Sequence, residues 1–162
     1  MKIVDVDLIP PVGDITETPK HDLVDLYKKC LEMAQVCVAE NGVGLSAVQV
    51  GIPWKMFVVK WPNDKFGFFV DCEYEPLGED QVDSDEGCLS LRGEDGKLKM
   101  YRVKRYSKVK ISGKALVPED KPVLKDVEIE LEGFYGIVFQ HEIDHHNGIL
   151  ISDTGQEVEL WR

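Results

Sequence analysis

The sequence contains one pentapeptide whose side chains could hold a catalytic metal ion, His141-Glu142-Ile143-Asp144-His145. If this segment is helical, His141 and His145 lie one turn apart on the same face and can bind one ion. Neutral imidazole is a good ligand for zinc or ferrous iron. Glu142 lies about 100° further round the helix, so it can stand beside the ion and take a proton from a water molecule there. The pattern therefore indicates a metal-dependent hydrolase.

Pentapeptides of this form also arise by chance, and a histidine on a helix can be a hydrogen-bonded core residue. The sequence before this pentapeptide favours the metal site. A helix is expected from Phe134 to about Asn147, and its upstream part carries Phe134, Ile137 and Val138. The histidines that follow on the same face therefore point toward a core or a pocket, where an imidazole without a partner would be destabilising.

Two histidines leave at least one protein ligand to be found. A zinc endopeptidase would offer a third histidine three residues after Gly148, but Ile151 stands there. Glu157 and Glu159 lie near the end of the chain, where a ligand is poorly held. Cys88 is the better candidate, because a thiolate and two imidazoles leave a fourth coordination position open. Taken alone, Cys88 reads more readily as a buried thiol than as a ligand.

A helix, a set of strands and a second helix must position these residues. The first helix is expected from Pro19 to Asn41, with Thr18 as N-cap and Gly42 as its stop. Four strands are expected between the helices, at Lys55–Lys60, Phe66–Cys72, Lys108–Ser112 and Val127–Leu131. This order predicts a single α+β domain over residues 1–162, in which short antiparallel strands pack around a central metal-binding helix.

The composition narrows the class of protein. Hydrophobic residues make up 43% of the 162, which suits a packed core, and the formal charge of -11 argues against nucleic-acid or anionic-membrane partners. No segment is apolar enough to cross a bilayer, and Asp5 and Asp7 interrupt any signal-peptide core. The four cysteines form no C-x-x-C pair, so reduced thiols in the cytoplasm are expected.

Three segments together resemble the peptide deformylase family: Gly42–Gln49, Glu86–Ser90 and His141–His145, in the order found in the family. The resemblance runs from the first helix to about Asp153. Deformylases are hydrolases of protein biosynthesis that remove the N-formyl group from the initiator methionine of nascent polypeptides and release formate. The resemblance implies the same N-terminal processing here.

The resemblance also implies roles for particular residues. Cys88, His141 and His145 would bind one divalent ion per chain. The usual ion in the family is ferrous iron, with zinc, nickel or cobalt as substitutes. The general acid/base would then be Glu142. The oxyanion donors are expected to be the side-chain amide of Gln49 and the backbone N–H of Leu89. Losing one such donor typically costs about 3 kcal/mol of transition-state stabilisation.

The peptide is expected to lie as an added strand beside the glycine-containing segments. The residues expected to contact it are Val43, Gly44, Gly87, Phe134, Ile137 and Val138, whose alternative role is ordinary core packing. Behind the ligands, Glu86, Arg105 and Asp144 are expected to orient them, with Arg105 paired to Glu86 or Asp144.

The sequence departs from common deformylases in several places. Ser46 replaces the usual alanine, which we treat as a minor change. Asp71-Cys72 stands for the usual Asn-Pro, and Leu91-Arg92 for an apolar residue followed by proline. The segment between the cysteine and histidine motifs is longer, and the turns at Gly93–Gly96 and Pro118–Pro122 are expected to absorb the excess. We expect these changes to alter the rim of the cleft and to leave the catalytic chemistry unchanged.

The sequence ends at Arg162, where bacterial members usually continue into a C-terminal helix that helps ribosome docking. Docking by that route is not expected, and the short end suggests a phage or an unusual bacterial origin, hence a bacterial cytoplasm. The expected partners are N-formylmethionyl peptides or nascent chains, and the expected state is a monomer.

Three other readings stay open: a zinc endopeptidase, an inactive deformylase-like formyl-peptide binder, and a structural metal site. Three protein ligands rather than four favour catalysis over a structural site. Because Glu142 and Gln49 are both present, nothing in the sequence signals a loss of chemistry. The residue types do not name the native metal, because a Cys-His-His site accepts several ions.

Overall fold

The computed structural model describes residues 1–159, so Arg162 lies outside the described residues. Three 3₁₀ helices occur, at Val6–Leu8, Val12–Asp14 and Ala47–Val50. The other elements, in chain order, are α1 (Leu23–Ala39), β1 (Gly44–Ser46), β2 (Met56–Lys60), β3 (Phe66–Pro76), β4 (Gln81–Arg92), β5 (Leu98–Tyr106), β6 (Lys108–Pro118), β7 (Pro122–Glu132), α2 (Gly133–His146), α3 (Ile151–Thr154) and β8 (Gln156–Val158).

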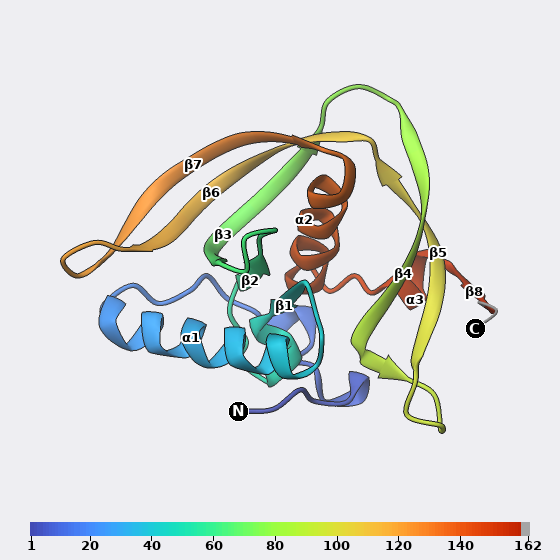
Figure 1. The fold of residues 1–162 in the computed structure, drawn as a ribbon, viewed down its shortest axis with the longest axis horizontal. Helices are drawn as coiled ribbons and strands as arrows, with labels where there is room; N and C mark the ends of the chain where they lie inside the picture. Colours follow the sequence, from blue (N-terminus) through green and yellow to red (C-terminus); the bar gives the residue numbers. More distant parts are fainter. Residues whose placement is uncertain (160–162) are drawn as a thin grey trace.

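Two antiparallel sheets enclose helix α2 (Figure 1). The first has the strand order β1-β2-β3-β6-β7 and the second the order β4-β5-β8. Helix α1 packs across one face of the first sheet, in contact with β1, β2 and β7, and α2 stands between the two sheets, in contact with strands of both. The predicted α+β class, with antiparallel strands around a central helix and a further helix near the N-terminus, is confirmed.

Helix α1 begins four residues later than predicted. Asp22, not Thr18, is the N-cap, and its side chain accepts a hydrogen bond from the backbone N–H of Asp25. Thr18 is buried and bonded elsewhere: its N–H donates to the carboxylate of Asp71, and its hydroxyl to the carbonyl of Lys55. These bonds to the first sheet hold the chain extended, which a helix starting at Thr18 would break.

The strands are longer and more numerous than predicted. The expected strands correspond to β2, β3, β6 and β7, while β1, β4, β5 and β8 were not predicted. In β4 and β5, charged side chains obscure any apolar alternation. They are paired across the strands instead, Asp83 with Lys104 and Asp85 with Arg102. Such cross-strand pairs are visible only when both strands and their register are known.

Strands β3 and β4 each contain one break in register, and residues at both breaks contact helix α2. The β3–β6 ladder shifts between Val70 and Glu73, where Asp71 takes a positive φ of 53°. The β4–β5 ladder runs without interruption to Gly87 and resumes at Arg92. The residues between them, Cys88 among them, are therefore released from regular pairing and can turn toward α2.

Three groups of buried apolar side chains hold these layers together. One packs α1 on the first sheet through Cys30, Met33 and Cys37, and a second packs Phe139 and Ile143 of α2 on the other side of that sheet. The third lies between the second sheet and α3. All four cysteines are free thiols. Within residues 1–159, none of the helices has the length and apolar character that a bilayer crossing requires.

Gly148, just after the end of α2, allows the packing of this end of the helix to be tested. Gly148 has a φ of +78°, and a Cβ built there would lie 2.7 Å from the Cβ of Val12. Gly96 has the same φ of +78° with no heavy atom within 4 Å of a built Cβ. We expect Gly96→Ala to cost about 1–2 kcal/mol from its left-handed backbone alone. Gly148→Ala should cost a further 1–3 kcal/mol, roughly, from overpacking against Val12.

Urea unfolding of the two variants measures the difference, because the backbone cost is common to both. Equal losses of stability in the two variants would contradict the packing of Gly148 against Val12.

Candidate active site

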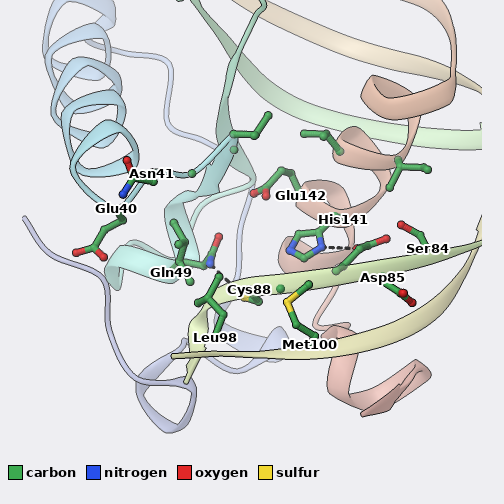
Figure 2. Close-up of a pocket in the computed structure, with 18 of the residues that line it drawn as sticks. Glu40, Asn41, Gln49, Ser84, Asp85, Cys88, Leu98, Met100, His141 and Glu142 are labelled. Carbon is green, nitrogen blue, oxygen red and sulfur yellow. Dashed lines mark hydrogen bonds and ion pairs between the residues drawn. The ribbon is translucent and has the colours of Figure 1, made fainter. Parts of the chain in front are cut away.

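A cysteine from β4 and two histidines from α2 lie close together, and two of the three, Cys88 and His141, line the inner end of a cleft (Figure 2). The Sγ of Cys88 and one ring nitrogen each from His141 and His145 all lie within 4.8 Å of one another. The Sγ of Cys88 is 3.5 Å from the Nε2 of His145. Tetrahedral ligands at ordinary zinc–sulfur and zinc–nitrogen distances are about 3.5 Å apart. The three donors therefore fit a single small divalent ion.

The charges around these donors suit a cation. Burial lowers the pKa of His145 well below its usual value, so this imidazole is neutral, as a metal ligand must be. For His141, burial opposes protonation, but hydrogen bonds to Cys88 and Glu86 outweigh it and raise the pKa to about 10. The groups around His141 thus favour a positive charge in the cluster, which either a proton or a metal ion can supply.

His141 is held by a carboxylate on its far nitrogen. Its Nδ1 lies 2.7 Å from Oε1 of Glu86, so that nitrogen carries the proton and Nε2 is left for the ion. Burial opposes the charge on Glu86, but Arg105 and His141 together lower its pKa to about 2. Glu86 therefore stays ionised, which makes His141 a stronger ligand.

Arg105 is buried between two carboxylates. Its Nε and Nη2 donate to Glu86 at 2.8 and 2.7 Å, and its Nη1 donates to Asp144 at 2.8 Å. On the other side, the hydroxyl of Tyr74 donates to Asp144 at 2.8 Å. Burial and then Asp144 raise the pKa of Tyr74, so the phenol keeps its proton. A continuous chain of hydrogen bonds runs from Tyr74 to His141.

Gln49 reaches the cluster from the 3₁₀ helix that follows β1. Its Oε1 accepts from the backbone N–H of Ser46 at 3.0 Å, which fixes the orientation of the amide. Its Nε2 then points to Cys88 and Ser90, with their side-chain heavy atoms each 3.4 Å away. Gln49 is buried and uncharged, so it presents an N–H at the metal end of the cleft.

Glu142 lines the cleft next to His141, and the hydrogen bonds found for its carboxylate involve neither Arg105 nor a histidine. It is 4% exposed and accepts from the hydroxyl of Ser46 at 3.0 Å. Burial raises the pKa of Glu142, although His141 and the Ser46 hydroxyl oppose the change. A carboxyl group with a raised pKa binds a proton more readily than an ordinary glutamate, which suits a general acid/base.

The cleft has a volume of about 480 Å³ and lies between the free edges of the two sheets. Gly42–Gly44 form one wall and Ser84–Leu89, with Leu98 and Met100 behind them, the other. Helix α2 lies across the cleft with Phe134, Ile137, Val138, His141 and Glu142. This shape suits an extended chain with one apolar side chain.

The structure thus brings together the residues named from the sequence. All six residues expected to contact substrate line the cleft, as do Gln49, Leu89 and Glu142, and Arg105 binds both of its expected partners. Sequence reasoning missed Tyr74, Ser90 and the contact of Ser46 with Glu142. A tyrosine in a partly buried strand signals that its hydroxyl needs a partner, but nothing along the chain links Tyr74 to Asp144.

Known proteins share both the sequence pattern and the fold. The family described as polypeptide deformylase matches residues 8–161. A peptide deformylase of Aquifex aeolicus is 35% identical over 90% of this chain and 81% of its own length, and one from Halothermothrix orenii is 34% identical over 90% of each chain. A probable peptide deformylase from Synechococcus phage S-SSM7 superposes with a TM-score of 0.77 at 27% identity, covering 95% of this chain and 99% of that one.

The position of Arg105 leads to a prediction about stability. Arg105→Met removes the guanidinium that bridges Glu86 and Asp144, and among the described residues it leaves the buried Asp144 carboxylate without an ion pair, while Glu86 keeps only His141. Breaking a buried ion pair in this way typically costs about 3–5 kcal/mol. We expect a loss of that size in urea unfolding at pH 7, accompanied by weaker metal binding because Glu86 no longer orients His141.

Arg102→Met is the matched control. Arg102 makes the same two-pronged contact with Asp85, but the pair is exposed, and we expect the unfolding midpoint to change little. Similar losses in the two variants would refute the special role of the buried pair.

Proposed function

The chain belongs to the polypeptide deformylase family, and from this premise we propose that its cleft hydrolyses the formyl group of N-formylmethionyl peptides. The enzyme is a peptide deformylase, which releases formate and a free amino terminus. The observation that carries the proposal is the cluster of Cys88, His141 and His145 beside Glu142, at the inner end of a cleft wide enough for a peptide.

Cys88, His141 and His145 would hold one divalent ion. When bound, such an ion polarises the formyl carbonyl and makes water a stronger nucleophile at neutral pH. The separation of the three donors, the neutrality of His145 and the carboxylate behind His141 all support this assignment. We propose ferrous iron as the native ion, with zinc, nickel and cobalt as substitutes that the same donors accept.

The remaining chemistry falls to groups of the chain. Glu142 takes a proton from the attacking water and later gives a proton to the departing amine. As the formyl carbon becomes tetrahedral, its oxygen gains negative charge. The Nε2 of Gln49 and the backbone N–H of Leu89 donate hydrogen bonds to that oxygen without adding a charge of their own.

The methionine side chain is proposed to bind the apolar face of α2. Phe134 is 59% exposed and Val43 36% exposed at the cleft, although large apolar side chains are normally covered. A bound methionine would cover them together with Ile137 and Val138. Gly44 and Gly87, with no side chains, would let the peptide backbone approach the free edges of β1 and β4 as an added strand.

We further propose that residues 1–162 act as one catalytic domain and as a monomer, on nascent polypeptides in the bacterial cytoplasm. The high acidic charge supports a peptide substrate over a nucleic acid. We do not propose docking to the ribosome through a C-terminal helix, because the sequence alone already argues against that route.

Formate release from a formyl-Met tripeptide tests the function. The protein is purified without oxygen, loaded in turn with ferrous, nickel or zinc ion, and assayed with a formate dehydrogenase couple. Release of formate with at least one ion is expected. No release with any of them, from a folded protein that retains the ion, would refute the proposed function.

Glu142→Ala separates catalysis from metal binding. Removal of the general acid/base should lower kcat about 10²–10⁴-fold, while the metal content stays at one ion per chain. His145→Ala should instead lose the ion itself, because a protein ligand is gone. Metal analysis of both variants beside the kinetics decides between the roles. Turnover by Glu142→Ala at the wild-type rate would remove Glu142 from the mechanism.

Exposure to air tests the proposed native metal. The ferrous enzyme should lose activity within the exposure, because oxygen oxidises the iron or the Cys88 thiolate that binds it. The nickel-loaded enzyme serves as the control and should keep its activity. If protein purified in its native state keeps full activity after long aeration, zinc or nickel replaces iron in the proposal.

A further inference from the structure

The hydroxyl of Ser46 lies between two oxygen atoms of Glu142. Its Oγ is 3.0 Å from Oε2 of the Glu142 side chain and 2.9 Å from the backbone carbonyl oxygen of the same residue. Ser46 is fully buried, with 0% of its surface exposed, so water cannot replace either contact. A hydroxyl has one hydrogen and two lone pairs, and it can donate to only one of these oxygens at a time.

The two contacts fix the direction of the Glu142 side chain. The contact with Oε2 holds one oxygen of the carboxyl group, and the contact with the backbone carbonyl ties the same hydroxyl to the helix turn that carries the side chain. A general acid/base must stay aimed at the atoms between which it moves a proton, so a buried partner at this place serves its function.

We propose that Ser46 is a positioning residue that holds the Glu142 carboxyl group aimed into the cleft. This inference rests on the proposed function, in which Glu142 is the general acid/base. It assigns a role to the one substitution in the Gly42–Gln49 segment that the sequence alone presents as minor.

The surroundings show why this contact matters. A Cβ built on Gly44 would lie 3.1 Å from Cγ, Cδ and Oε1 of Glu142, so the Gly44 backbone closes one side of the carboxyl group. Ser46, two residues along the same strand, holds Oε2. Strand β1 therefore contacts the side chain at two points, and loss of the hydroxyl removes the hydrogen bond to Oε2.

Replacement of Ser46 by alanine removes this contact with little other change. The bond that orients Gln49 comes from the backbone N–H of Ser46, which alanine retains. Alanine is also smaller than serine and introduces no clash in the buried site. The variant therefore leaves the backbone donor to Gln49 in place while it frees the carboxyl group of Glu142.

The experiment compares steady-state kinetics of Ser46→Ala, Ser46→Thr and wild type, each loaded with the same ion, on a formyl-Met tripeptide. We expect Ser46→Ala to lower kcat about 5- to 20-fold, the range for losing part of a hydrogen bond to a charged group. KM should stay within about twofold, because the peptide contacts are unchanged. Metal content and the visible spectrum of the cobalt-loaded form should match wild type. Ser46→Thr keeps the hydroxyl and should retain most of kcat.

Ser112→Ala, at an exposed position of β6, is the matched control and should leave kcat unchanged. An unaltered kcat in Ser46→Ala, even with a lower melting temperature, would overturn the proposal and leave Ser46 a structural role. Equal losses of kcat in folded Ser46→Ala and Ser46→Thr would overturn it too, because packing would then explain both. If Ser46→Thr does not fold, the split between kcat and KM in Ser46→Ala decides alone. No formate release from wild type would refute the proposed function instead.

Discussion

The fold depends on one constraint: helix α2 buries five polar side chains, and each needs a partner in the surrounding strands. These side chains are Gln140, Glu142, Asp144, His145 and His146. A buried polar group without a partner is costly, so the strands can pack on this helix only in positions that supply one. The partners come from both sheets, and the helix consequently fixes how the two sheets face each other.

The contacts around the helix show this constraint element by element. Gln140 bonds the backbone N–H and C=O of Tyr106, as a strand neighbour would, and so ties α2 to the end of β5. On the other side, the ring of His146 bonds the carbonyl of Cys72 in the irregular part of β3. With the helix anchored to a strand of each sheet, His141 and His145 have little freedom. The donor atoms of the Cys-His-His cluster are therefore held in place by the contacts of the fold itself.

The sequence allowed the grouping of the candidate site residues to be predicted better than the arrangement of the strands. His141 and His145 are four residues apart on a helix, so their joint geometry follows from local structure. Cys88 could be added only through its resemblance to a known motif, because its approach depends on the break in the β4–β5 ladder. Strands β4 and β5 were missed because their charged side chains hide the apolar alternation and pair only across the two strands, and Tyr74 because its partner lies 70 residues away. What could not be predicted is what depends on register between distant strands.

The free strand edges beside the cleft complete the relation between fold and function. A sheet edge exposes unpaired backbone groups and is normally short, charged or covered. Here β1 ends one sheet and β4 ends the other, and both edges line the cleft where Glu142 and Cys88 lie. Extending either sheet by another strand of the chain would fill this cleft. An open cleft therefore requires both edges to stay unpaired, and α2 packs behind them with contacts to both sheets.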